Sequence, residues 1–317
     1  MTAPVRWGIL GTANIARKSL LPAVAAAGGV AQVVGSRSTD RAAAWAAEHG
    51  VARGTDYEGV LTADDVDAIY VALPNDRHVE WAARAAATGK AVLCEKPLAL
   101  DAAEVHTLVD GLDAGARVWE AFVFPFHPQT QHIASLLPEL GDPLQLFSEF
   151  HFSLPAGGNI RWDATGGGAL YDVGCYSIRL ARLLFGTEPD AAHGSAVRNA
   201  DGVDTSSTAV LDFPDERRLL LSASIQRPFS TRTRVVGTRA ELHVDNPFHP
   251  KPGDTVTLVR DGEVVDTWTA DERLAFAHGV AHVQAVVAGT EAPRHTVLDD
   301  GLAQARALDL VRAAVDA

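Results

Sequence analysis

The first part of the chain alternates between short, continuous apolar runs and longer segments with a helical period. The apolar runs predict buried strands at residues 5–10, 31–35, 66–73, 91–94 and 117–121. The intervening segments predict helices, one through Leu20, Leu21 and Val24 and others at residues 40–49, 78–88 and 101–114. Strands that alternate with helices of this length form βαβ units. We therefore predict an α/β fold whose N-terminal part is a Rossmann-type, doubly wound parallel sheet.

Farther along, the apolar positions change to a period of two. In residues 144–154, Leu146 and Phe150 share one face with further apolar residues, whereas Gln145 and Glu149 lie on the other. This alternation predicts a half-buried antiparallel strand. Further strands are predicted at residues 208–213, 219–226, 231–236, 240–244, 255–260 and 263–269, with hairpin turns at 214–216 and 261–262.

The same region contains three helical patterns, at residues 128–140, 276–288 and 297–317. We therefore expect a C-terminal α+β domain with a large, mainly antiparallel open sheet. The predicted domain boundaries are 1–122 and 123–317. An antiparallel sheet that is open on one face often associates through it, which predicts a homodimer.

Composition narrows the range of partners. The chain has 317 residues, 47% of them hydrophobic, and a formal net charge of −13. This charge argues against nucleic acid and against an anionic membrane as a partner. Neither a signal peptide nor an apolar run of about 18 residues is present, so no membrane span is expected. Cys94 and Cys175 form no disulfide framework, which favours a cytoplasmic location.

A tight turn connects the first predicted strand to the first helix. Its sequence, Gly11-Thr12-Ala13-Asn14-Ile15-Ala16, gives the pattern Gly-x-Ala-x-x-Ala. Strand, glycine turn and helix form the context of a dinucleotide-binding fingerprint. Ala13 adds a methyl group where the usual second glycine lets the backbone approach a pyrophosphate.

The second predicted strand ends at Ser36 and Arg37, and Arg41 lies about one helical turn farther on. An NAD site would place a carboxylate near this strand end to hold the ribose hydroxyls. Hydroxyl and guanidinium donors without that carboxylate suit a 2′-phosphate, which predicts NADP rather than NAD. The alternative is that Arg37 is a solvated residue at a helix start.

The strand at residues 91–94 ends in Glu95-Lys96-Pro97. A lysine just past the carboxyl end of a buried parallel strand lies where such sheets bind their ligands. In a dinucleotide-binding domain it would reach the nicotinamide end of the site, where an amine can handle the alcohol proton that accompanies hydride transfer. The alternative for Lys96 is a solvated Lys-Pro turn.

A glycine run, Gly166-Gly167-Gly168, leads into a helical pattern that begins at Leu170. Asp172 and Tyr176 are four residues apart and are predicted to share one face of this helix. A phenol and a carboxylate arranged in this way could bind and deprotonate a substrate hydroxyl. A buried structural tyrosine with an aspartate near the helix start is the alternative.

Three of these segments together resemble the glucose–fructose oxidoreductase/inositol dehydrogenase (Gfo/Idh/MocA) family. The matching motifs are Gly8-Ile9-Leu10-Gly11, Glu95-Lys96-Pro97 and Gly167-Gly168-Ala169-Leu170-x-Asp172-x-Gly174-x-Tyr176. The branch that the chain resembles includes trans-dihydrodiol dehydrogenase, NADP-dependent D-xylose dehydrogenase and deoxysugar 3-ketoreductases. The resemblance implies an NADP-dependent oxidoreductase that acts on a CH–OH group of a sugar, cyclic polyol or dihydrodiol. It also implies a substrate-binding second domain that dimerises through its sheet.

The resemblance assigns residue roles as well. Lys96 would be the general acid/base or polarise the carbonyl, Tyr176 would share proton transfer, and Asp172 would position the substrate. Arg161 and Trp162 would bind substrate. The expected cofactor-binding residues are Gly11, Thr12, Ala13, Asn14, Ile15, Ser36, Arg37, Arg41, Leu73, Pro74, Asn75, His78, Glu95 and Lys96.

Two other interpretations remain open. A non-catalytic NADP-binding sensor or regulatory protein would share the first domain, although it could lose Lys96, Asp172 and Tyr176. His278 and His282 have the spacing of a metal-binding helix, but no glutamate lies between them and no carboxylate cluster completes a site. We therefore expect no metal.

Overall fold

The computed structural model describes residues 3–142, 144–155, 157–271 and 274–316. The packing of the chain divides it into two compact units, Met1–Val123 with Phe276–Leu302, and Phe124–Ala275 with Ala303–Ala317. The domain boundary between residues 122 and 123 stays a prediction. The division by packing differs from it in assigning residues 276–302 to the first unit.

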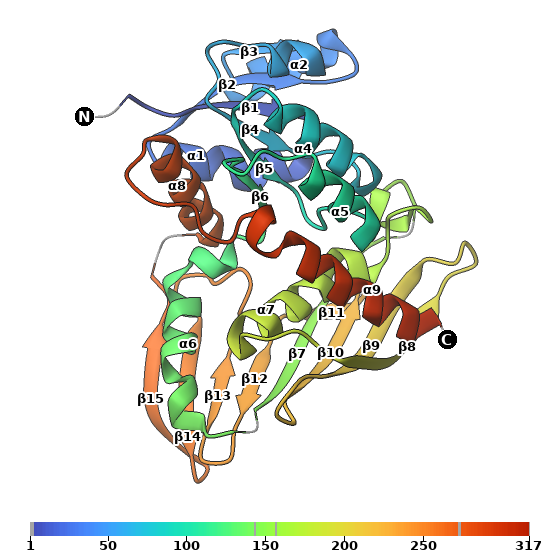
Figure 1. Ribbon diagram of the computed structural model, residues 1–317, viewed down its shortest axis with the longest axis vertical. Helices are drawn as coiled ribbons and strands as arrows, with labels where there is room; N and C mark the ends of the chain where they lie inside the picture. Colours follow the sequence, from blue (N-terminus) through green and yellow to red (C-terminus); the bar gives the residue numbers. More distant parts are fainter. Residues whose placement is uncertain (1–2, 143, 156, 272–273, 317) are drawn as a thin grey trace. The chain divides into compact units, whose positions relative to one another are not determined.

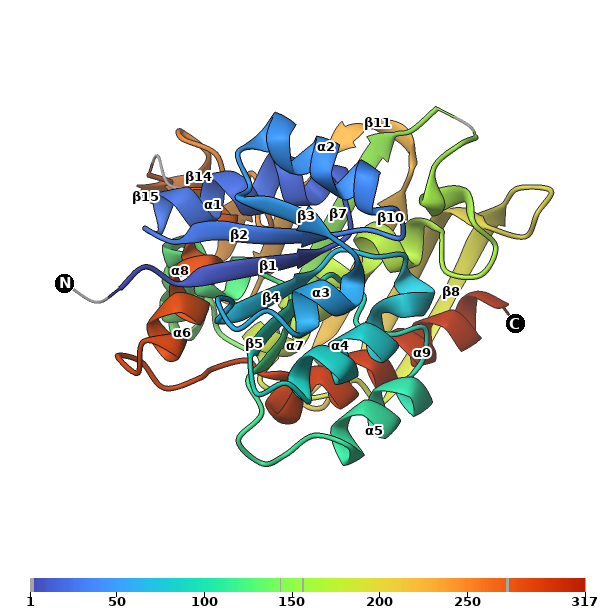
Figure 2. The same cartoon turned by 90° about the horizontal axis from the view of Figure 1, so that it is seen from above.

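In the first unit, six strands within the described residues form a parallel sheet (Figure 2). In sheet order these are β3 (Arg53–Thr55), β2 (Val30–Gly35), β1 (Arg6–Leu10), β4 (Ala68–Val71), β5 (Ala91–Cys94) and β6 (Val118–Glu120). Every residue of β4 and β5 is buried, as a sheet covered on both faces requires. The order reverses between β1 and β4, so ligands are expected at the carboxyl ends of these two strands.

Helices cover both faces of this sheet. In Figure 2, α1 (Leu21–Ala26) and α2 (Thr39–His49) lie on one face, and α4 (His78–Ala86) and α5 (Ala102–Asp110) lie on the other. A π-helical turn, Ala16–Leu20, leads into α1. The short helix α3 (Tyr57–Leu61) and the later helix α8 (Ala275–Val287) complete the list for this unit. The doubly wound arrangement predicted from the sequence is confirmed.

In the second unit, nine strands within the described residues form one large sheet. Eight follow the order β15 (Glu263–Thr269), β14 (Thr255–Arg260), β13 (Glu241–Val244), β12 (Thr233–Val236), β7 (Gln145–Ser153), β10 (Arg218–Ser224), β9 (Asp204–Asp212), β8 (Ala191–Arg198), while β11 (Gln226–Ser230) pairs with β7. The sheet is mainly antiparallel, as predicted. However, β7 is antiparallel only to β11 and β12 and runs parallel to β10, so the antiparallel prediction for residues 144–154 is wrong on one side.

Helices pack on one face of this sheet, as Figure 1 shows for α6 and α7. The helices are α6 (Pro128–Leu140), α7 (Cys175–Phe185) after a π-helical turn at Leu170–Gly174, and α9 (Leu302–Asp316) after a similar turn at Val297–Gly301. Short 3-10 turns occur in both units, at Asn75–Arg77 in the first and at Phe124–Phe126 and Ile160–Trp162 in the second. The predicted C-terminal helix is confirmed up to Asp316, and its last residue lies outside the described residues. Among the described helices, none is long and apolar enough to span a bilayer.

Both predicted hairpin turns are present. Asp215 and Glu216 have positive φ values of 59° and 58° between β9 and β10, and Asp261 and Gly262 have 53° and 83° between β14 and β15. Two consecutive residues with positive φ are typical of the turns that match the twist of a hairpin. The turn residues therefore favour these two hairpin connections of the second sheet.

Candidate active site

The carboxyl edge of the parallel sheet carries the predicted cofactor-binding residues. Gly11, Ser36, Leu73 and Glu95 follow β1, β2, β4 and β5, respectively. Because the strands are parallel, these four loops lie along the same edge. The structure thus assembles side chains that are more than 80 positions apart in sequence into one candidate site.

Gly11 forms the turn at the point where the strand order reverses. Its φ is +105°, and a Cβ atom there would collide with the backbone oxygen of Ala72, the residue that follows β4. The Gly11 amide also donates to the Gly35 carbonyl at the end of β2, at 3.0 Å. Only glycine therefore fits this junction of three strands. Thr12 and Ala13 are half-buried and lead into the first helix, whereas Asn14 and Ile15 are exposed.

At the end of β2, Ser36 is fully buried and Arg37 is exposed. The Ser36 hydroxyl oxygen accepts two hydrogen bonds from Arg41, from Nε at 2.9 Å and from Nη2 at 2.7 Å. Because both bonds use oxygen lone pairs, the hydroxyl proton is left to donate elsewhere. The strand end therefore presents the guanidinium groups of Arg37 and Arg41, and the buried Ser36 hydroxyl holds Arg41 in place.

His78, predicted to bind the cofactor, lies between two loops of the candidate site. Its side chain is fully buried at the start of α4, with Nδ1 2.7 Å from the Pro97 carbonyl oxygen and Nε2 2.8 Å from the Leu73 carbonyl oxygen. Burial lowers the pKa of His78, so the neutral ring donates to one of these carbonyls. His78 thus connects the loop after β4 to the loop that carries Lys96, while Pro74 and Asn75 remain more accessible in the first of these loops.

Several buried groups fix the loop around Lys96. The Tyr70 hydroxyl on β4 donates to the Glu95 carboxylate, and the Glu95 amide donates to the Val71 carbonyl at 2.9 Å. On the other side, the Leu98 amide donates to the Glu120 carboxylate at 2.9 Å. The backbone on both sides of Lys96 is therefore anchored to β4 and β6. A lysine whose backbone is anchored in this way carries its amine at a defined position beside bound ligand.

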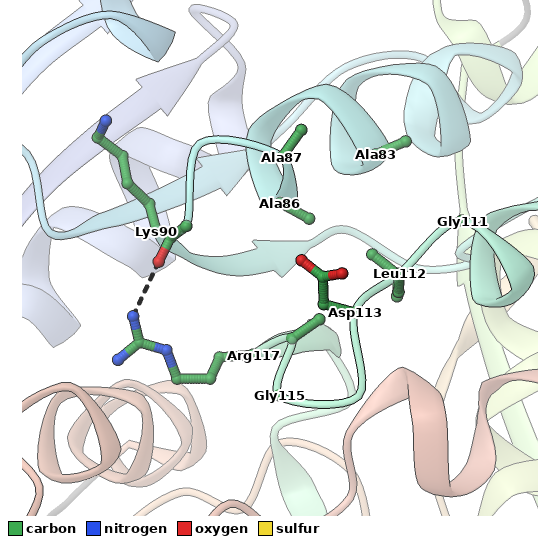
Figure 3. Close-up of a pocket in the computed structure, with 11 residues that line it drawn as sticks. Ala83, Ala86, Ala87, Lys90, Gly111, Leu112, Asp113, Gly115 and Arg117 are labelled. Carbon is green, nitrogen blue, oxygen red and sulfur yellow. Dashed lines mark hydrogen bonds between the residues drawn. The ribbon is translucent and has the colours of Figure 1, made fainter.

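A separate pocket lies at the opposite edge of the same sheet (Figure 3). It has a volume of about 290 Å³ and is lined in part by Lys90, Asp113 and Arg117. Lys90 and Arg117 directly precede β5 and β6, so this pocket borders the amino ends of these strands. Parallel sheets bind nucleotides at the carboxyl ends, so we do not assign the cofactor to this pocket.

In the second unit, Asp172 forms an ion pair with Arg161. The distance from Arg161 Nε to Asp172 Oδ2 is 2.5 Å, and the Asp172 side chain is only 13% exposed. Trp162 donates its indole N–H to the Pro155 carbonyl at 3.0 Å, so this group holds its own loop. Arg161 and Trp162, both predicted to bind substrate, therefore lie in one short turn. Arg161 is already paired with Asp172, a third predicted substrate-binding residue.

Tyr176 lies in the first turn of α7 and is 7% exposed. The preceding turn, which contains Asp172, is π-helical, with hydrogen bonds from residue i to i+5. An offset of four residues is less than a full turn of a π-helix, whereas an α-helix places such residues on one face. The shared face of Asp172 and Tyr176 stays a prediction. Their partners differ: Asp172 contacts Arg161, and the Tyr176 hydroxyl lies 3.4 Å from His249 Nε2.

Asp204 supports the start of this helix, a role that was not predicted from the sequence. Its carboxylate accepts from the Leu170 amide at 2.8 Å and from the Ser207 hydroxyl at 2.7 Å. Burial raises the pKa of Asp204, against the effect of these two hydrogen bonds. A single aspartate at the start of a strand gives no sequence signal for a contact with a helix 34 residues earlier.

His282 has structural partners on both ring nitrogens. Nδ1 is 2.8 Å from the Glu291 carboxylate, and Nε2 accepts from the Arg294 amide at 3.2 Å. The i, i+4 spacing with His278 therefore does not make His282 available as a ligand. The expectation of no metal stays a prediction.

Comparison with known protein families gives two matches in chain order. Residues 5–121 match a model described as "Oxidoreductase family, NAD-binding Rossmann fold", and residues 138–243 match one described as "GFO/IDH/MocA C-terminal domain". The first match covers the parallel sheet with its candidate cofactor edge. The second match covers the segment that carries Asp172 and Tyr176.

Curated relatives extend over most of the chain. It is 39% identical to D-xylose 1-dehydrogenase (NADP(+)) 2 of Haloferax volcanii, over 91% of this chain and 90% of that protein. It is 32% identical to dTDP-3,4-didehydro-2,6-dideoxy-alpha-D-glucose 3-reductase of Actinomadura kijaniata, over 98% and 95% of the two chains. Among solved structures, it resembles the A. kijaniata 3-ketoreductase KijD10 in complex with NADP and TDP-benzene, with a TM-score of 0.88, 30% identity and 98% coverage of both chains. This chain therefore belongs to the GFO/IDH/MocA oxidoreductase family.

Proposed function

We propose that this oxidoreductase uses NADP(H) and transfers hydride between nicotinamide and a secondary alcohol, ketone or anomeric carbon of a sugar, cyclic polyol or dihydrodiol. The observation that carries the proposal is Lys96, whose loop is anchored at the carboxyl edge of a dinucleotide-type sheet. The names of the relatives support the substrate class, because they include a D-xylose dehydrogenase and a deoxysugar 3-reductase.

The donors at the end of β2 fit NADP. Arg37 and Arg41 offer guanidinium groups without an adjacent carboxylate on the strand end, and Ser36 orients Arg41. Such a set suits a 2′-phosphate. The glycine turn at Gly11 and the helix that follows it suit the pyrophosphate, because backbone N–H groups at a helix start favour anions. Leu73, Pro74, Asn75 and Glu95 would line the remainder of this edge.

Bound NADP(H) would supply or accept the hydride. In the oxidation direction, Tyr176 takes up the hydroxyl proton as the carbonyl forms, and in reduction it returns it. The cationic form of Lys96 also stabilises negative charge on the substrate oxygen. Asp172, paired with Arg161, accepts hydrogen bonds from other hydroxyls and so orients a polyol.

A non-catalytic NADP-binding sensor is the alternative, and absorbance at 340 nm separates the two. The protein is incubated with NADP⁺ and a panel of aldoses, polyols and dihydrodiols, and with NADPH and the matching ketones. We expect saturable turnover of at least one member. Saturable cofactor binding with no turnover of any member would favour the sensor.

Arg37→Ala should collapse the preference for NADP⁺ over NAD⁺. A hydrogen bond to a charged group contributes roughly 1.5–3 kcal/mol, which is on the order of 10- to 100-fold in affinity. We expect the wild-type ratio of kcat/KM for the two cofactors to exceed ~10. The variant should lower it mainly through the KM for NADP⁺. Arg117→Ala, at the opposite sheet edge, is the control and should leave the ratio unchanged. A wild type that prefers NAD⁺ would refute the assignment.

We also propose a cytoplasmic homodimer that forms through the open face of the large sheet. Phe147, Leu220 and Val210 lie in register on neighbouring strands, are half-exposed, and alternate with buried residues. They make an apolar row on the uncovered face, the kind of surface that a second copy can bury. Sedimentation equilibrium should give twice the mass of one chain, and Leu220→Lys should shift it toward one chain. A chain of 317 residues with two cysteines suits a reducing compartment.

A further inference from the structure

His249 lies within hydrogen-bonding reach of the Tyr176 hydroxyl. The distance from His249 Nε2 to the Tyr176 oxygen is 3.4 Å, and the two rings meet edge to face with centroids 5.3 Å apart. This donor–acceptor distance is at the long end of the range for a hydrogen bond. Hydrogen bonds between catalytic groups are often long before substrate binds and shorten in the complex.

The loop that carries His249 is held in a fixed shape by Asn246. The Asn246 amide donates from Nδ2 to the His249 carbonyl at 2.6 Å, and its Oδ1 accepts from the His249 amide at 3.1 Å. Thr231 donates to the same Oδ1 at 3.1 Å, and buried Gln129 on α6 donates to the Asn246 carbonyl at 2.8 Å. The backbone of His249 is therefore tied to α6 and to the segment before β12.

Aromatic packing sets the direction of the ring. Phe248 is fully buried and stacks on Phe150, with the ring centroids 5.6 Å apart. The centroids of the Phe248 and Tyr176 rings are 5.2 Å apart. Phe150 also contacts the His249 ring at 5.9 Å. This packing holds the His249 ring with Nε2 toward the Tyr176 hydroxyl.

We propose that His249 is a positioning residue for Tyr176, and that it also exchanges a proton with the phenol during turnover. The proposal rests on the proposed oxidoreductase function. In the oxidation direction, His249 Nε2 accepts the phenol proton as the Tyr176 O–H bond breaks. The phenolate oxygen accepts the proton of the substrate hydroxyl as hydride leaves the carbon for NADP⁺. The imidazolium then releases one proton to water, so the reaction yields ketone, NADPH and one proton.

A double-mutant cycle tests this relay. His249→Phe keeps an aromatic ring and removes both nitrogens, and Tyr176→Phe removes only the hydroxyl. Loss of a proton-transfer partner should lower kcat by about tenfold or more, toward the 100-fold typical of such groups, with KM changed less. In the Tyr176→Phe background, His249→Phe should change kcat by less than about twofold, because the hydroxyl through which it acts is gone.

Two further measurements separate a proton partner from packing. Added imidazole should restore part of the kcat of His249→Ala, whereas His249→Gln should recover substrate KM better than kcat because an amide cannot accept the proton. NADPH affinity, measured by fluorescence titration, should stay unchanged in all variants. His106→Phe, at an exposed site on α5, is the control for a histidine-to-phenylalanine change and should retain full kcat.

The outcomes that overturn the proposal are distinct from failure of the proposed function. Wild-type kcat in His249→Phe, a silent Tyr176→Phe, or multiplicative effects in the double variant would each exclude the relay. If the wild type turns over no substrate, the oxidoreductase proposal fails instead. The hydrogen bond can then still be tested by melting temperature, where additive shifts of the two single variants in the double variant would disprove the coupling.

Discussion

Replacement of Lys96 by Met is expected to reduce kcat by at least ~100-fold, the low end for loss of an acid/base group. Met matches the length of the lysine stem and removes only the charge and the donor. The loop should keep its shape, because Tyr70 anchors Glu95 and Glu120 anchors Leu98. The rate loss would therefore report chemistry and not folding.

The Lys96 experiment has a matched control at the opposite end of β5. Lys90 directly precedes β5, and its amine donates to the Leu61 carbonyl at 3.0 Å. Lys90→Met should change kcat by less than about twofold, since solvent-side substitutions away from a site have small effects. Steady-state kinetics at 340 nm measure kcat, and fluorescence titration measures NADPH affinity, which should change far less than kcat in Lys96→Met. Near-normal turnover in that variant would remove Lys96 from the mechanism.

The first sheet was predictable because its signals are local. The five predicted strands are mainly apolar, and each turn that follows them contains glycine, proline or a helix cap such as Ser38 or Asp101. The short strand β3, with sequence Arg-Gly-Thr, has no apolar run and was not predicted. The right-handed connection rule then fixes which face each helix covers. These constraints suffice to bring the loops after β1, β2, β4 and β5 to one edge without any knowledge of long-range contacts.

The second sheet was predicted less completely. Strand β8, with sequence Ala-Ala-His-Gly-Ser-Ala-Val-Arg, has few large apolar residues and is largely exposed, so no alternation marks it. It forms because β9 offers a full antiparallel partner. The parallel pairing of β7 with β10 also leaves no local signal, because the two strands are far apart in sequence and no turn connects them.

The same division applies to the candidate site. The positions of Lys96, Ser36 and Tyr176 follow from strand ends and a helix pattern, which are local. The partners that hold them do not: His78 bonds across two loops, Asp204 bonds to the Leu170 amide, and His249 meets Tyr176 from 73 residues away. The sequence around His249 contains one local signal. Pro247 and Pro250 flank Phe248 and His249 and restrict their backbone.

Gly168→Ala is expected to be strongly destabilising. The φ of Gly168 is +108°, outside the regions that L-residues populate, and an added Cβ would collide with the Asp204 carboxylate. That carboxylate cannot retreat freely, because it is buried and accepts from the Leu170 amide and the Ser207 hydroxyl. The substitution must therefore strain the backbone or break the contact that starts the helix.

Backbone strain of this kind costs about 1–3 kcal/mol, and forcing extra volume into a packed site costs a further 1–3 kcal/mol or so. We expect Gly168→Ala to lower the free energy of unfolding by about 3 kcal/mol or more, measured by urea denaturation. Activity should fall as well, because Asp172 bonds to the Gly168 carbonyl through its amide at 3.0 Å, so a shift of Gly168 displaces Asp172.

Gly186→Ala is the matched control at the other end of α7. Gly186 also has positive φ, +66°, but an added Cβ would meet no atom within 4 Å. Its replacement should cost only the left-handed backbone penalty of about 1–2 kcal/mol and should leave kcat unchanged. Equal losses in the two variants would mean that backbone strain alone matters. In that case the contact between Gly168 and Asp204 would not be what fixes the start of the helix that carries Tyr176.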